Sequence, residues 1–232
     1  MRFLASLIFL FVLMATALSQ ANECVMPKAD TLAADYDWNR YRERNACLRQ
    51  INNIPADYYM LTLSYSPRFC KEQAGASPGG AIKAQYAFQC TSTNTFGWIV
   101  HGLWPQSFRP KQCQDGGKTV EMHPRYCGGD RIGQVDPMVI RKYMCMQPGE
   151  SLLQSQWEKH GSCGPFKTAE EYFAKTHQLF EALTLPKEDL RPPRVFQVLK
   201  RDNPQLQQVR LGYASGEIRV CYNKDWQYID CP

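Results

Sequence analysis

Residues 96–105 read FGWIVHGLWP, a stretch that sets a titratable side chain among apolar ones. Its first six residues are mostly aromatic and β-branched, which favours a largely buried strand. Gly102 and Pro105 are expected to end that strand. An imidazole at the end of a buried strand, beside a glycine and two tryptophans, suggests the edge of a cleft. His101 is therefore a candidate functional residue, and a hydrogen-bonded core histidine is the alternative.

Helix and strand patterns alternate around this stretch, with neither an internal repeat nor a linker. Tyr58 to Ser66 alternates apolar and polar residues, which predicts a strand. Asp136 before a proline and the Thr168–Glu171 pair are typical helix starts. Further strands are expected within 206–213, 217–223 and 226–230, further helices within 152–160 and 192–201, a short helix within 35–49, and loops over 70–95 and 106–134. These elements favour one α+β domain.

The N-terminus has the pattern of a secretory signal. A positive start, MRF, precedes an apolar run over 4–17, and small residues follow it. We predict a signal peptide over 1–21, cleaved after Ala21, with cleavage after Ser19 as an alternative. Since no later apolar run reaches that length, the mature chain is expected to be exported, soluble and free of the membrane.

All ten cysteines lie after the predicted signal peptide. An even number in an exported chain predicts up to five disulfides. The C-x-x-C and H-x-x-x-H spacings of metal ligands do not occur in the sequence, so no metal site is expected. The missing N-x-S/T sequon favours a bacterial periplasm, with extracellular release as the alternative. The net charge of +5 is compatible with an anionic substrate but too small to identify one.

A second polar cluster lies in QWEKHG, residues 156–161. At about 100° per residue, Gln156, Lys159 and His160 share one helical face, whereas Glu158 points elsewhere. An amide, an ammonium and an imidazole together suit a dianionic transition state. The alternative is a solvated helix end, where cations interact favourably with the helix dipole.

Two histidines can provide one acid and one base, because an unperturbed imidazole has a pKa of about 6.5. Metal-free RNA cleavage needs such a pair. One group takes the proton of the ribose 2′-hydroxyl, the other protonates the departing 5′-oxygen, and the product is a 2′,3′-cyclic phosphate. His101 and His160 are the candidates. His123 lies in a loop and His177 in an amphipathic helix, and both are expected to be structural or solvent-facing.

The motifs HGLWP at 101–105 and WEKHG at 157–161, followed by Cys163, resemble the two active-site segments of the ribonuclease T2 family. The resemblance covers residues 58–232 and leaves 22–57 as an N-terminal extension. It implies an exported, disulfide-bonded endoribonuclease with an α+β fold, a central antiparallel sheet and a cleft between the motifs. The implied protein is a monomer without a cofactor that cuts single-stranded RNA with low base specificity and leaves DNA intact.

The resemblance also implies roles for single residues. His101 corresponds to the general acid, His160 to the general base, and Lys159 to the cation that stabilises the phosphorane. Gln156 occupies a further catalytic position. The expected substrate contacts are Trp104, as a wall for base stacking, together with Trp157 and Ser155.

The second motif departs from the family pattern H-E-W-x-K-H-G. Ser155 and Gln156 stand at its first two positions, so an amide replaces the acidic residue. Gln156 can donate a hydrogen bond to a phosphate oxygen, but it cannot exchange a proton. Because acid–base assistance is worth about 10²–10⁴ in rate, the alternative function is RNA binding or signalling with weakened turnover.

Three disulfide pairings are expected. Cys221 and Cys231 flank a short turn, so their β-carbons can meet without strain. Cys70 and Cys90 bracket a loop and form a second pair. Cys163 is expected to bond to a cysteine within 113–145. That bond disfavours another alternative, a cysteine hydrolase that uses Cys163 beside a histidine.

Gln156→Glu should raise kcat with little change in KM, because a carboxyl group at that position acts mainly in the transition state. Glu158→Gln, a change on another helical face, should have almost no effect. Steady-state kinetics on one dinucleotide compare the two variants. A crippling Glu158→Gln beside a neutral Gln156→Glu would show instead that Glu158 has taken over the role.

Overall fold

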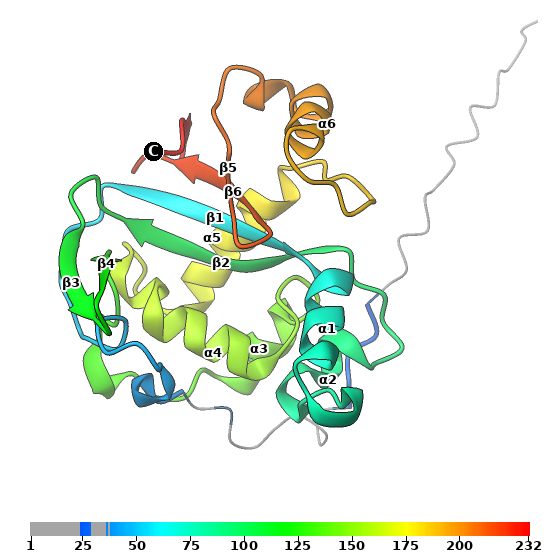
Figure 1. The fold of residues 1–232 in the computed structure, drawn as a ribbon, viewed down its shortest axis with the longest axis horizontal. Coiled ribbons are helices and arrows are strands. Elements are labelled where there is room, and N and C mark those ends of the chain that lie inside the picture. The colour runs from blue at the N-terminus through cyan, green and yellow to red at the C-terminus, as the bar shows by residue number, and fades with distance from the viewer. Residues whose placement is uncertain (1–23, 29–35, 37) are drawn as a thin grey trace, which may run out of the picture.

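A five-stranded antiparallel sheet forms the centre of the computed structural model, which describes residues 24–28, 36 and 38–232 (Figure 1). The strands span Tyr58–Tyr65 (β1), Trp98–Gln106 (β2), Lys111–Asp115 (β3), Lys118–Met122 (β4), Gly212–Ala214 (β5), Glu217–Tyr222 (β6) and Tyr228–Ile229 (β7). The sheet has the order β2-β1-β6-β5, β7 pairs with β6, and β3 and β4 form a separate hairpin. The α+β fold class and the antiparallel sheet agree with the sequence-based expectation.

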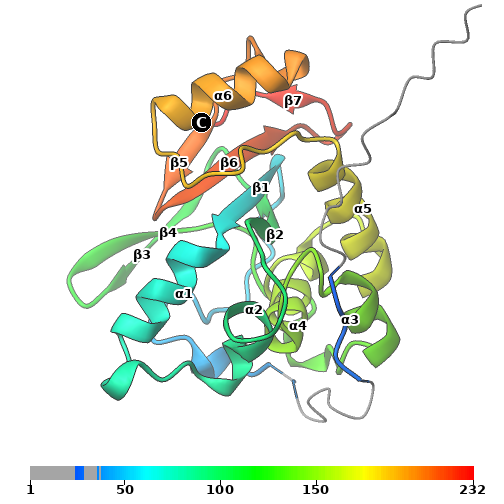
Figure 2. The same cartoon turned by 90° about the vertical axis from the view of Figure 1, so that its right-hand side faces the viewer.

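The helices gather around this sheet. They span Ser66–Gly75 (α1), Ala87–Cys90 (α2), Pro137–Tyr143 (α3), Glu150–Lys159 (α4), Ala169–Glu181 (α5) and Arg194–Asp202 (α6). Figure 2 shows α3, α4 and α5 grouped on one side of the molecule, with α6 over the end of the sheet that β5, β6 and β7 form. Within the described ranges, no helix combines the length and the apolar character that crossing a membrane requires.

Alternation along β1 separates two faces of the sheet. Tyr59, Leu61 and Leu63 belong to the main apolar core, which also contains buried side chains of α3, α4, α5 and α6. Met60 lies on the opposite face, in a smaller cluster against which Trp104 packs. The face that carries Met60 is the one on which polar side chains gather.

Three expectations about local structure are wrong. The loop expected over 70–95 contains the end of α1 and all of α2, and α1 starts at Ser66 because a proline in the first turn favours a helix start. β2 continues through Gly102 and Pro105. β2 is the edge of the sheet, where a missing backbone N–H is tolerated. The loop expected over 106–134 contains the hairpin of β3 and β4, whose two-glycine turn has positive φ angles at Gly116 and Gly117.

Two further elements are shorter than expected. The strand expected within 206–213 is reduced to β5 at Gly212–Ala214. The short helix expected within 35–49 is, in the described part of that range, only a 3₁₀ turn at Arg40–Arg42.

The predicted signal peptide over 1–21 lies outside the described residues.

Five disulfides use all ten cysteines. They join Cys24 to Cys145, Cys47 to Cys113, Cys70 to Cys90, Cys127 to Cys163, and Cys221 to Cys231. The third and fifth are the two complete pairs expected from the sequence, and the partner of Cys163 lies in the expected region. A bonded Cys163 has no thiolate to act as a nucleophile, which excludes the cysteine-hydrolase alternative.

Two of these disulfides tie the residues before β1 to later parts of the chain. Cys47 is joined to β3 through Cys113, and Cys24 is joined to Cys145 after α3. Asn52 also makes a β-bridge with Arg125 in the loop after β4. The segment 38–54 is therefore held beside that loop.

Candidate active site

A cleft of about 490 Å³ opens on the polar face of the sheet. β1, β2 and β6, the loop after β4, the end of α4 and the N-terminal segment all contribute to its lining. The cleft brings together His101, Gln156, Lys159 and His160 from the two sequence motifs. A second hollow of about 320 Å³ shares the first three of these residues and continues past Ser155.

His101 reaches the cleft because it lies at a β-bulge in β2. The register between β1 and β2 shifts between Thr62 and Leu63, which makes His101 the extra residue of β2. An extra residue bends its strand and turns its side chain out of the regular alternation. The Nδ1 atom of His101 lies 2.6 Å from Oε1 of Glu217 on β6. This contact fixes Nδ1 and leaves Nε2 as the nitrogen available for chemistry.

The residue after His101 must be a glycine for the two motifs to meet. A β-carbon at Gly102 would collide with Oε1 of Gln156 and would lie 2.5 Å from Nε1 of Trp104. The side chains of Trp104 and Gln156 meet in the space beside Gly102, where the Trp104 indole donates to Oε1 of Gln156 at 2.8 Å. Gln156 is therefore the link between α4 and β2, and its side chain is buried.

α4 presents one polar face to the cleft and one apolar face to the core. Leu153 is fully buried in the core, whereas Gln156, Lys159 and His160 all line the cleft. α4 ends at Lys159, and the backbone N–H of His160 donates to the carbonyl of Gln156 at 3.0 Å. The shared face expected from helix geometry is the arrangement observed.

Trp157 does not reach the cleft, contrary to expectation. Trp157 follows Gln156 in α4 and therefore projects about 100° further around the helix axis. Its ring packs against Tyr172 at the main core. Ser155 lines the second hollow. Glu158 also faces away, and its Oε1 accepts a hydrogen bond from Nε2 of Gln154 at 2.6 Å. Glu158 therefore does not take the place of the acid that is missing at Gln156.

His160 lies in a buried, cationic environment. Its ring stacks on Trp104 with centroids 5.2 Å apart, and its Nδ1 has no hydrogen-bond partner among the described residues. Burial is the main cause that holds the pKa of His160 well below the ordinary value, and the charges of Arg125 and Lys159 lower it further. His160 is thus neutral where an ordinary histidine would begin to protonate.

Lys159 is enclosed by the N-terminal segment. Its ammonium lies 2.6 Å from Oε1 of Glu43 and 4.0 Å from the centre of the Trp38 ring. Arg125 donates to the same Oε1 at 2.9 Å. Burial lowers the pKa of Lys159, and Glu43 opposes that effect. Burial also opposes ionisation of Glu43, but Lys159 and Arg125 together bring its pKa below the ordinary value.

The sequence-based reasoning missed several residues of the site. Glu43, Arg125 and Glu217 come from segments without a recognised motif, and no local spacing connects them to the histidines. His123 was expected to be structural or solvent-facing. The structure places it in the cleft, where its Nδ1 accepts from the backbone N–H of Ser107 at 3.1 Å. His177 lies on α5, partly exposed and 3.2 Å from Glu181, as expected for a surface residue.

Comparisons with known proteins agree on one family. A model of the ribonuclease T2 family matches residues 56–200. A probable ribonuclease of Haemophilus influenzae is 42% identical over 188 residues, which cover 81% of this chain and 65% of that protein. A ribonuclease of Aeromonas hydrophila is 30% identical over 133 residues, 57% of this chain and 47% of that protein. The chain thus spans less than two thirds of the length of either relative.

The fold itself is similar to that of a solved structure. The RNase-related protein from Calystegia sepium matches with a TM-score of 0.50 at 18% sequence identity. The match covers 77% of this chain and 92% of that one. At this identity the similarity concerns the arrangement of helices and strands only.

Gly102→Ala should destabilise the protein by about 1–3 kcal/mol, because the added methyl group collides with Gln156 and Trp104. Thermal denaturation measures the loss. Gly97→Ala is the matched control, since a β-carbon there meets no atom within 4 Å. Equal melting temperatures of the two variants would contradict the close packing at Gly102.

Arg125→Gln should raise the pKa of His160, because it removes a positive charge that disfavours the imidazolium. Burial remains, so the pKa should stay below that of a free histidine. NMR titration of the imidazole resonances measures the shift. Arg194→Gln, at an exposed position in α6, is the control. An unchanged titration in Arg125→Gln would contradict the electrostatic cause.

Proposed function

The chain belongs to the ribonuclease T2 family, and from this premise we propose that it is an endoribonuclease that cleaves single-stranded RNA without a metal ion. The observation that carries the proposal is that one cleft brings together His101, His160 and the ammonium of Lys159. Two imidazoles beside one phosphate can act as acid and base in the same step.

His160 is the proposed general base. Its lowered pKa keeps the ring neutral, so a ring nitrogen can accept the proton of the ribose 2′-hydroxyl. The freed oxygen then attacks the adjacent phosphorus. Burial beside two cations is unfavourable for the imidazolium that results, which promotes the return of the proton in the second, hydrolytic step.

His101 is the proposed general acid. The contact between Nδ1 and the carboxylate of Glu217 orients the ring, so Nε2 is the nitrogen that gives a proton to the departing 5′-oxygen. The product of this step is a 2′,3′-cyclic phosphate. The cleavage step needs both histidines, because one accepts a proton while the other donates one.

Lys159 and Trp104 complete the proposed mechanism. Lys159 provides the positive charge for the phosphorane, whose oxygens become more negative in the transition state. The ring centroid of Trp104 lies 5.2 Å from those of both His101 and His160, so it packs against both rings. Trp104 lines the larger hollow and is the candidate stacking surface for a base.

The two hollows support a substrate that extends past the phosphate on both sides. They share His101, Gln156 and Lys159, where the scissile phosphate would lie. Each hollow then has room for one nucleoside. A duplex could not separate its bases in this way, which favours single-stranded RNA.

We further propose that the protein works as a monomer in an oxidising compartment, either the periplasm or the extracellular space. Five disulfides support the oxidising compartment, because such bonds form and persist where thiols are not kept reduced.

A second candidate function is RNA binding or signalling with weakened turnover. The observation that favours it is Gln156, which lines the cleft at the motif position where the family pattern has an acid. This candidate predicts binding of RNA with little cleavage, and the same assay distinguishes the two functions.

Purified protein in EDTA should cleave a dinucleotide of RNA and release a 2′,3′-cyclic phosphate, because both proton transfers and the positive charge come from side chains. Chromatography of the products detects the cyclic phosphate. The matching DNA dinucleotide should remain intact, since it lacks the 2′-hydroxyl. Loss of cleavage in EDTA with recovery in Mg²⁺ or Zn²⁺ would overturn the mechanism.

His101→Ala and His160→Ala should each reduce kcat by about 10²–10⁴. The two losses should not add in the double variant, because the acid and the base act in one step. His177→Ala, on the surface of α5, is the control. A double variant far less active than either single variant would indicate separate steps.

A further inference from the structure

The N-terminal segment contributes a carboxylate, that of Glu43, to the lining of the cleft. Glu43 lies outside the residues that the family model matches, which begin at 56. Its side chain is 17% exposed, and it lines the cleft with both proposed catalytic histidines. Gln156 stands where the family pattern has an acid, and Glu158 of the second motif faces away from the cleft. The cleft therefore contains an acidic group that neither motif supplies.

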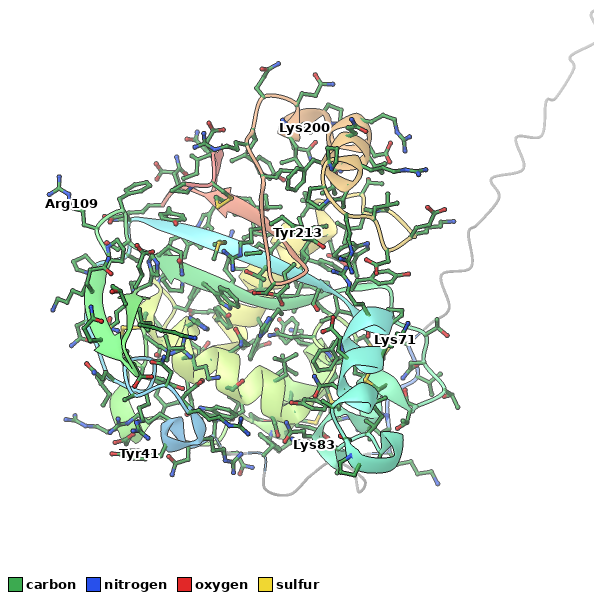
Figure 3. The ribbon with its side chains drawn as sticks, in the orientation of Figure 1. Tyr41, Lys71, Lys83, Arg109, Lys200 and Tyr213 are labelled. Atoms are coloured by element: carbon green, nitrogen blue, oxygen red, sulfur yellow. A yellow bond between two sulfur atoms is a disulfide. The ribbon has the colours of Figure 1, made fainter. Side chains whose placement is uncertain are left out.

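The position of Glu43 is fixed by contacts on both sides of it. Arg40 donates to Asp130 at 2.8 Å and to the backbone carbonyl of Arg49 at 2.8 Å. Further along, the Cys47–Cys113 disulfide ties the segment to β3. Tyr41, by contrast, projects from the surface in Figure 3 and is 61% exposed. Glu43 thus points inward from a segment that is anchored at several points.

We propose that Glu43 is a positioning residue of the active site, which delivers from the N-terminal segment the carboxylate that the second motif lacks at position 156. Its carboxylate holds the ammonium of Lys159 where the phosphorane forms. This inference rests on the proposed function, since it assigns Glu43 a part in the same reaction.

The charges around Glu43 leave the site able to bind a phosphate. One carboxylate oxygen contacts two cations, Lys159 at 2.6 Å and Arg125 at 2.9 Å. The three groups together keep one positive charge in excess, which a phosphate can use. Trp38 covers the ammonium from another side. The ammonium is thereby restricted to one place before the substrate binds, which reduces the entropy cost of reaching the transition state.

Glu43 also favours the charged form of Lys159. Burial lowers the pKa of Lys159, whereas Glu43 raises it. Removal of the negative charge should therefore lower the pKa of Lys159, so that the ammonium loses its proton at a lower pH. The titratable and charged groups that interact with Lys159 or line the hollows with it are Glu43, Tyr86, His101, Glu121, His123, Arg125, Glu158, His160, Glu217 and Arg219.

Glu43→Gln should lower kcat by about 10- to 100-fold without raising KM, and it should move the alkaline limb of the kcat profile to lower pH. Glu43→Asp keeps the charge, so its alkaline limb should stay nearer to that of the wild type. Asp130→Asn is the matched control. It also removes an ion pair of the N-terminal segment, but Asp130 lies outside the cleft lining.

The double variant Glu43→Gln with Gln156→Glu tests whether the site needs a carboxylate. Restoring an acid at position 156 should recover part of the lost kcat. The gain from Gln156→Glu should be larger in the Glu43→Gln background than in the wild type, which a double-mutant cycle measures. Equal gains in both backgrounds would show that the two positions do not serve the same role.

Two other outcomes would overturn the inference. An unchanged or higher kcat in Glu43→Gln would mean that the carboxylate is dispensable or obstructs the substrate. A loss equal to that of Asp130→Asn, with an unchanged pH profile and a lower melting temperature, would mean that Glu43 only stabilises the fold.

A measurement without cleavage separates this inference from the proposed function. NMR titration of the Lys159 side chain should give a lower pKa in Glu43→Gln than in the wild type. If the wild type cleaves no RNA, the proposed function fails, and this titration still tests the effect of Glu43 on Lys159. An unchanged Lys159 titration would then overturn the inference by itself.

Discussion

The close approach of α4 to the edge strand β2 is the constraint on which the site depends. At Gly102 the strand has no side chain, and Gln156 fills the space and accepts the Trp104 hydrogen bond. On the core side, the hydroxyl of Tyr172 in α5 both accepts from the backbone N–H of Leu103 and donates to its carbonyl, each at 3.1 Å. β2 is thus held by α4 at Gly102 and Trp104 and by α5 at Leu103, which sets the spacing between the two histidines.

Residues close together in sequence were the predictable part of the site. The face formed by Gln156, Lys159 and His160 follows from helix geometry alone, and the strand around His101 follows from its apolar residues. The hairpin of β3 and β4 was missed because its side chains are mostly exposed, so no apolar alternation marks it. Pro105 led to the wrong prediction that the strand ends before it. A proline is tolerated in an edge strand, and the sequence of one strand does not show whether it lies at the edge of its sheet.

The remaining parts of the site depend on tertiary contacts that no local pattern encodes. Glu217 meets His101 across the sheet, and Glu43 meets Lys159 across the cleft. Charged residues of this kind resemble ordinary surface residues in the sequence. Trp157 was expected to contact the substrate because it belongs to a motif. Its position on the helix instead directs the ring into the core. A residue of a motif can thus pack in the core, while charged residues outside the motifs contact the histidine and the lysine of the cleft.

The disulfides make the geometry of this cleft conditional on the redox state of the surroundings. The Cys47–Cys113 link spans 66 residues and holds the segment that carries Glu43, and the Cys127–Cys163 link joins the loop after β4 to the turn that follows α4. Both links persist only where thiols become oxidised. A newly made chain in a reducing compartment would lack these two restraints. Under the proposed export, oxidation would complete the proposed catalytic centre only after the chain has left the RNA of the cell that made it.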